Sequence, residues 1–135
     1  MSGAMYRILV VEDNRDSREM LKTILAESGN EFDITGVETA AEALVLDARR
    51  EFDLYVLDIW LPGMDGIDLC RRLRERKRTQ PVILFSAMVQ PTDRHYVLDA
   101  GANEFLIKPK DLDIFVPTVE RLLGIERVGG GTMIG

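Results

Sequence analysis

The chain has 135 residues, 46% of them hydrophobic and 30% charged, which is ordinary for one globular domain with its own core. Its formal net charge of −6 argues against broad electrostatic attraction to nucleic acid or to an anionic membrane. No apolar run approaches the roughly 20 residues of a membrane span, and the first residues lack the apolar region of a signal peptide. The single cysteine, Cys70, cannot form an internal disulfide, so we expect a cytoplasmic domain.

Short apolar runs alternate with segments of helical periodicity along most of the chain. The run YRILVV is typical of a strand buried on both faces, and Thr39 with Glu42 forms a capping-box pattern at a helix start. In chain order, the pattern predicts a strand at 6–11, a helix at 16–28, a strand at 33–37, a helix from Thr39 to about Arg50, a strand at 53–57, a helix around Leu69 and Leu73, a strand at 81–86, a helix near 92–100, a strand at 104–107 and a helix within 112–123. Five strand–helix units predict an α/β fold, a parallel sheet with helices on both faces.

The ends of the chain are less regular. Pro117 lies inside the last apolar stripe, so the last helix either starts near Asp113 or is kinked. The final residues, VGGGTMIG, show no periodicity. We therefore expect one domain over 6–124, an N-terminal extension at 1–5, and a flexible tail or clipped linker at 125–135.

Polar residues gather where four of the five predicted strands end. In sheets of this kind, ligands bind beyond the carboxyl ends of the strands. The sequence therefore predicts that three carboxylates, one hydroxyl and one ammonium share a small site. These residues are Glu12, Asp13, Asp58, Ser86 and Lys108.

This combination of groups points to phosphoryl chemistry. Neighbouring carboxylates repel one another unless a cation intervenes, and oxygen ligands of this kind suit Mg²⁺. An ionised aspartate can attack a phosphoryl group and form an acyl phosphate. The metal, the Lys108 ammonium and the Ser86 hydroxyl would then neutralise or bind the phosphoryl oxygens.

Four segments, VVEDN, VLDIWLPGMDG, LFSA and EFLIKP, occur in this order and resemble the receiver domain of two-component response regulators. The resemblance covers roughly Tyr6 to Leu123. It implies a doubly wound, flavodoxin-like, five-stranded parallel sheet in the order 2-1-3-4-5 with five flanking helices. It also implies a phosphorylation-controlled signalling switch of a two-component or phosphorelay pathway, not an enzyme in the usual sense.

The resemblance assigns a role to each matching residue. Asp58 is the expected phospho-acceptor, and Pro109 is expected to follow a cis peptide bond. The expected ligands of Mg²⁺, for which Mn²⁺ can substitute, are Glu12, Asp13, Asp58 and the backbone carbonyl of Trp60. The residues expected to contact the phosphoryl group or to switch are Ser86, Ala87, Lys108 and Phe105.

The resemblance also implies partners. A histidine kinase or a phosphotransfer protein would donate the phosphoryl group to Asp58. The resemblance is also compatible with a homodimer formed through the fourth helix, fifth strand and fifth helix. Neither a membrane nor nucleic acid is an expected partner of this domain alone.

Several positions depart from the usual receiver pattern, among them Trp60, Met88 and Phe105. Trp60 and Met88 occupy the two variable positions that flank the phosphoryl group, and neither can orient an attacking water. We therefore expect slow self-dephosphorylation. Phe105 stands where tyrosine is common, so it has no hydroxyl to bond the backbone when it turns inward.

Two other functions are weaker interpretations. A Mg²⁺-dependent phosphohydrolase of the haloacid-dehalogenase type also uses an aspartyl nucleophile, but it needs a second acid two residues later, where this chain has Trp60. A flavodoxin-like cofactor binder needs a phosphate-binding loop after the first strand, and none is found there.

Some residues receive a structural interpretation only. We interpret Asp65 and Gly66 as a turn and helix start. Cys70 is expected to be a partly buried core thiol, and the lone His95 receives no role. A basic cluster is expected to form a solvated helix face rather than a nucleic-acid site; its members are Arg71, Arg72, Arg74, Arg76, Lys77 and Arg78.

Overall fold

A five-stranded parallel sheet forms the centre of the molecule. The computed structural model describes residues 5–87 and 89–126, and within them the strand order is β2-β1-β3-β4-β5. Each neighbouring pair of strands is parallel, so the predicted fold class and strand order are confirmed. The strands are β1 (Tyr6–Val11), β2 (Phe32–Val37), β3 (Leu54–Leu57), β4 (Val82–Ser86) and β5 (Glu104–Ile107).

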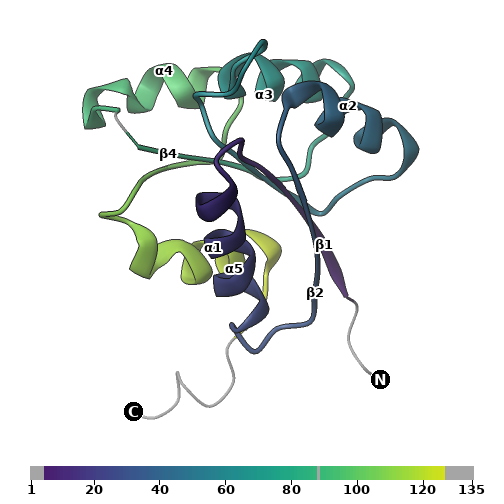
Figure 1. Cartoon of the computed structure of the whole chain (residues 1–135), viewed down its shortest axis with the longest axis vertical. Coiled ribbons are helices and arrows are strands. Elements are labelled where there is room, and N and C mark those ends of the chain that lie inside the picture. Colours follow the sequence, from purple (N-terminus) through teal and green to yellow (C-terminus); the bar gives the residue numbers. More distant parts are fainter. Residues whose placement is uncertain (1–4, 88, 127–135) are drawn as a thin grey trace.

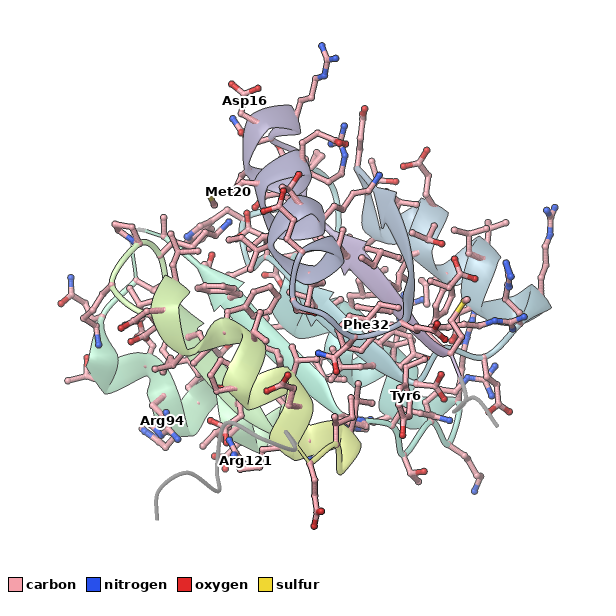
Figure 2. The ribbon with its side chains drawn as sticks, turned by 90° about the horizontal axis from the view of Figure 1, so that it is seen from below. Tyr6, Asp16, Met20, Phe32, Arg94 and Arg121 are labelled. Atoms are coloured by element: carbon pink, nitrogen blue, oxygen red, sulfur yellow. The ribbon has the colours of Figure 1, made fainter. Side chains whose placement is uncertain are left out.

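Helices cover both faces of this sheet. The helices α2, α3 and α4 lie on one face, and α1 and α5 lie on the other (Figure 1). Figure 2 shows Asp16 and Met20 projecting from the outer side of α1. The helices are α1 (Arg15–Ala26), α2 (Ala40–Arg49), α3 (Gly66–Glu75), α4 (Arg94–Asp99) and α5 (Phe115–Leu123), with short 3-10 turns η1 (Pro91–Asp93) and η2 (Leu112–Ile114).

The core consists of two apolar clusters, one on each side of the sheet. Alternate residues of β1 point to opposite faces, so Leu9 and Val11 belong to one cluster while Ile8 and Val10 belong to the other. All four side chains are fully buried. Burial on both faces explains why this strand is a continuous apolar run in the sequence.

The helix ends follow local chemistry. The Thr39–Glu42 capping box is present, as the sequence predicts. The last helix begins at Phe115, after the 3-10 turn η2, so Pro117 falls in its first turn, where no backbone N–H is needed for the helix. Pro117 left two alternatives open, a helix that starts near Asp113 or a kinked helix. The observed start at Phe115 corresponds to the first of them.

The basic cluster is a solvated helix face only in part: Arg71 and Arg72 are exposed on α3, whereas Arg74 and Arg78 are half-buried. Helix α3 ends at Glu75, so Lys77 and Arg78 lie beyond it. Arg74 is half-buried, and its guanidinium donates to the carbonyl oxygens of Gly101 and Gln80, at 2.8 Å in each case. This arginine therefore ties the end of α3 to neighbouring loops.

Arg76 and Arg78 bind a buried carboxylate. Asp47 on α2 is fully buried and accepts hydrogen bonds from Arg76 at 3.0 Å and from Arg78 at 3.1 Å. The hydroxyl of Tyr55, which is also fully buried, donates to Asp47 at 2.6 Å. Burial, together with the Asp47 carboxylate, raises the pKa of Tyr55. These side chains fasten α2 to β3 and to the segment after α3.

Further sequence expectations concern the chain ends, Met88, Cys70 and membrane spans. Residues 1–4, Met88 and 127–135 lie outside the described residues, so most of the N-terminal extension and tail does too. Cys70 is fully buried rather than partly buried. Within 5–87 and 89–126, no helix is long and apolar enough to cross a membrane.

Candidate functional site

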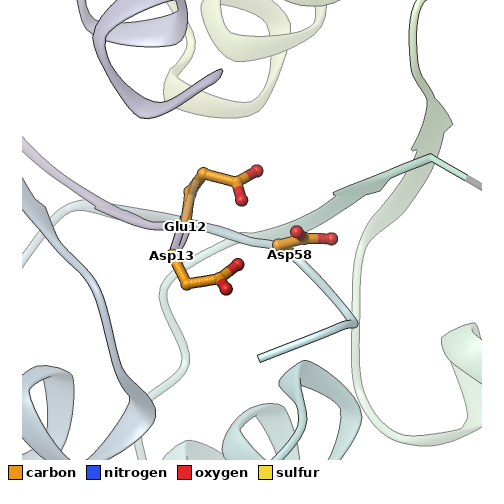
Figure 3. A group of neighbouring side chains, drawn as sticks. All are labelled: Glu12, Asp13 and Asp58. Carbon is orange, nitrogen blue, oxygen red and sulfur yellow. The ribbon is translucent and has the colours of Figure 1, made fainter. Parts of the chain in front are cut away.

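The sheet register brings two acidic strand ends together. Glu12 and Asp13 follow β1, and Asp58 follows β3, the neighbouring strand. The backbone N–H of Asp58 donates to the carbonyl of Val11 at 2.9 Å, which extends the pairing one step past the strands. One carboxylate oxygen from each of Glu12, Asp13 and Asp58 lies within 4.8 Å of the other two (Figure 3).

The Asp58 carboxylate is largely buried. Its residue is only 8% exposed, and burial raises the pKa of its carboxyl group. The hydrogen bond from Ser86 lowers this pKa, whereas the charge of Glu12 raises it, and the pKa lies at about 6. Asp58 is therefore ionised at neutral pH, but its charge is less well solvated than that of an ordinary aspartate.

Glu12 behaves in the opposite way. Burial raises its pKa, but hydrogen bonds from the Lys108 ammonium and the Asn14 backbone N–H, with the positive charge of Lys108, hold the pKa below its ordinary value. The Asn14 bond measures 3.0 Å. Lys108, just after β5, also donates to the hydroxyl of Ser17 at 2.9 Å. An ammonium thus stands beside the carboxylates.

Ser86 completes the link between β3 and β4. It is fully buried at the end of β4, and its hydroxyl donates to Asp58. The same oxygen accepts a hydrogen bond from the backbone N–H of Ile59 at 3.3 Å. The hydroxyl is therefore held next to the Asp58 carboxylate by the fold itself.

The three carboxylates and Lys108 line one open pocket of about 430 Å³, whereas the fully buried Ser86 is not among the lining residues. Trp60 forms part of its wall and is 57% exposed. The indole Nε1 donates to the carbonyl oxygen of Ala87 at 3.1 Å, so the Trp60 side chain bridges the loops that follow β3 and β4. The lining residues are Glu12, Asp13, Asn14, Ser17, Asp58, Trp60, Ala87 and Lys108.

Not every predicted site residue lies in this pocket. Phe105 is 4% exposed and belongs to the apolar cluster beneath α2, α3 and α4. The Lys108–Pro109 peptide bond is cis. Met88 lies outside the described residues.

The sequence interpretation missed Ser17 as a pocket residue. Asn14 caps α1, because its side chain accepts from the backbone N–H of Ser17 at 2.8 Å. A cap directly after the acidic strand end places the first turn of α1 beside the carboxylates. That capping pattern is the sequence signal that could have identified Ser17.

The carboxylates fit a hard divalent cation. Glu12 and Asp58 are buried beside each other, and Asp13 adds an exposed carboxylate oxygen within reach. Mg²⁺ binds through a few such oxygens and keeps its remaining positions for water or substrate. The arrangement can therefore hold a cation next to a nucleophilic carboxylate.

Comparison with known proteins identifies the family. Residues 8–120 match the family model described as the response regulator receiver domain. This match covers most of the chain, which therefore belongs to the receiver domains of two-component response regulators.

Curated relatives support the same assignment. The chain is 40% identical over 107 residues to the transcriptional regulatory protein TcrA of Mycobacterium tuberculosis, covering 79% of this chain and 42% of TcrA. It is 36% identical over 117 residues to the response regulator MprA of a Mycobacterium species, covering 87% of this chain and 50% of MprA. The chain thus spans about half the length of these relatives.

Solved structures share the fold. The receiver domain of a Francisella response regulator is 30% identical with a TM-score of 0.81, over 88% of this chain and 97% of that one. The response regulator TrrA of Thermotoga maritima, solved in complex with Mg²⁺-BeF, is 33% identical with a TM-score of 0.77, over 87% of this chain and 99% of that one.

Proposed function

We propose that this domain is a phosphorylation-controlled switch that accepts a phosphoryl group on Asp58. The observation that carries the proposal is the buried Asp58 carboxylate, which lies beside Glu12 and Asp13 and accepts a hydrogen bond from Ser86. Membership of the receiver family supports a histidine kinase or a phosphotransfer protein as the donor.

The proposed step transfers a phosphoryl group from the imidazole nitrogen of a histidine to a carboxylate oxygen of Asp58. A carboxylate oxygen of Asp58 attacks the phosphorus of a phosphohistidine, a P–O bond forms, and the P–N bond breaks. The electron pair of the broken bond stays on the imidazole nitrogen of the donor. Asp58 must be ionised to attack, which its pKa of about 6 permits at neutral pH.

The surrounding groups stabilise the transferred phosphoryl group. Bound Mg²⁺ would supply positive charge to the phosphoryl oxygens, and its ligands would be Glu12, Asp13, Asp58 and the backbone carbonyl of Trp60. Lys108, at the carboxyl end of β5, contributes a second positive charge. The Ser86 hydroxyl and the backbone N–H of Ala87 donate hydrogen bonds to the phosphoryl oxygens.

The switch itself rests on small movements near β4 and β5. Ser86 must exchange its bond with the Asp58 carboxylate for one with the phosphoryl group. The buried Phe105 belongs to the same apolar cluster as Val97 of α4, so its movement would be felt at that helix. The resulting change on α4, β5 and α5 would favour a partner or a second copy of the domain on that surface.

Phosphorylation with a small-molecule phosphodonor tests this function. With Mg²⁺ and acetyl phosphate, intact-protein mass spectrometry is expected to show one added phosphoryl group, which peptide mapping places on Asp58. The Asp58→Asn variant is expected to gain none, and the exposed-site control Asp99→Asn is expected to react like the wild type.

Two results would contradict the proposal. An adduct on another residue would remove Asp58 from its role. Continuous release of phosphate without an accumulating adduct would favour the phosphohydrolase instead.

Replacing Trp60 by asparagine is expected to speed loss of the phosphoryl group by a factor on the order of ten, because an amide can orient an attacking water that the indole excludes. Phosphorylated protein freed of donor is followed by mass spectrometry or by phosphate release. The Trp60→Phe variant keeps an apolar ring and serves as the control. Equal lifetimes of the wild-type and Trp60→Asn adducts would contradict the idea.

A further inference from the structure

Lys108 is held by a closed ring of hydrogen bonds. Its ammonium donates to the Glu12 carboxylate and to the Ser17 hydroxyl, the latter at 2.9 Å. Glu12 accepts from the backbone N–H of Asn14 at 3.0 Å, and the Asn14 side chain accepts from the backbone N–H of Ser17 at 2.8 Å. The ring joins the end of β1, the first turn of α1 and the end of β5.

Burial makes this ring important for Lys108. The side chain of Lys108 is only 11% exposed and that of Glu12 only 3%. A long lysine side chain can adopt many rotamers, and holding one of them requires several partners. An ammonium has three N–H donors, of which Glu12 and Ser17 engage two within the described residues.

We propose that Ser17 is a positioning residue that orients the Lys108 ammonium for an incoming phosphoryl oxygen. This inference rests on the proposed function. Ser17 lines the same pocket as Asp58, and its hydroxyl fixes one N–H of the ammonium so that another points into the pocket. Ser17 is not a ligand of the metal and does not touch the phosphoryl group in this proposal; it acts through Lys108.

The test compares an anion with a cation as probes of the same pocket. Calorimetry measures binding of beryllium fluoride, a phosphoryl analogue, in the presence of saturating Mg²⁺, and separately binding of Mg²⁺ alone. Ser17→Ala is expected to weaken beryllium fluoride binding by about three- to tenfold, because a hydrogen bond from a charged donor is lost. Mg²⁺ binding is expected to change by less than about twofold, because the hydrogen bond between Lys108 and the metal ligand Glu12 remains in the variant and Ser17 itself is not a ligand.

Two controls separate positioning from general damage. The backbone cap of α1 remains in Ser17→Ala, because the N–H of residue 17 still bonds Asn14. Ser17→Thr retains the hydroxyl and is expected to restore beryllium fluoride binding. In a Lys108→Ala background, Ser17→Ala is expected to have no further effect on beryllium fluoride binding.

Some outcomes would overturn this inference alone, and one would overturn the proposed function as well. Unchanged or tighter binding of beryllium fluoride by Ser17→Ala would overturn the inference alone, as would an equal loss of Mg²⁺ and anion affinity. Additive effects of the Ser17 and Lys108 substitutions would also overturn it. A wild type that binds no beryllium fluoride with Mg²⁺ would overturn the proposed function and this inference with it.

Discussion

Replacing Asp47 by alanine is expected to lower the free energy of unfolding by about 3 kcal/mol. Asp47 is fully buried and is the shared acceptor for Tyr55, Arg76 and Arg78. Without it, the buried Tyr55 hydroxyl loses its partner. The two arginines are partly exposed, with side chains 36% and 21% exposed, so water can resolvate them and limit the loss.

Thermal and urea unfolding measure this effect in parallel. A loss of about 3 kcal/mol corresponds to a fall in Tm of roughly 10 °C for a domain of this size. The matched control is Asp99→Ala, an exposed aspartate on α4, which is expected to stay within about 0.5 kcal/mol of the wild type. Equal stabilities of the two variants would show that the buried cluster contributes little.

Replacing Gly66 by alanine is expected to cost on the order of 3 kcal/mol or more. Gly66 is the first residue of α3, and its N–H donates to the carbonyl of Ile59 at 2.9 Å. A Cβ atom at this position would lie 2.0 Å from the carbonyl oxygen of Asp58. Because the clash is with backbone, either α3 or the acceptor loop must move.

This second substitution also affects the site. The clash is with the backbone of Asp58 itself, so we expect its relief to shift this residue relative to α3 and acetyl phosphate to yield much less adduct than with the wild type. Gly63→Ala is the matched control in the same loop. It lies in open space but has a φ of +79°, so it is expected to cost only about 1 kcal/mol and to retain phosphorylation. A Gly66→Ala protein with wild-type stability and adduct yield would contradict the packing argument.

The sequence alone was sufficient to predict the α/β fold, the strand order through its family resemblance, and the meeting of Glu12, Asp13 and Asp58. These features depend on periodicity and on the rule that parallel strands end at one edge. The bounds of α1, α2 and α4 were predicted to within a few residues, and the start of α2 is marked by the local chemistry of Thr39 and Glu42.

Only the tertiary structure decided which polar groups pair. Asp47 and Arg78 are 31 residues apart, and Lys108 and Ser17 are 91 apart. Periodicity assigns a residue to a face, but its partner depends on how two elements pack across that face. For that reason the sequence placed Arg74 and Arg78 in solvent, whereas the structure places one against loop carbonyls and the other on a buried carboxylate.

The same division applies to the candidate site. Residue types and their order along the chain determined that three carboxylates, a hydroxyl and an ammonium would gather at the sheet edge. The contacts of Trp60 with Ala87 and of Lys108 with Glu12 and Ser17 were decided by the folded loops, because side-chain direction there depends on packing between segments distant in sequence.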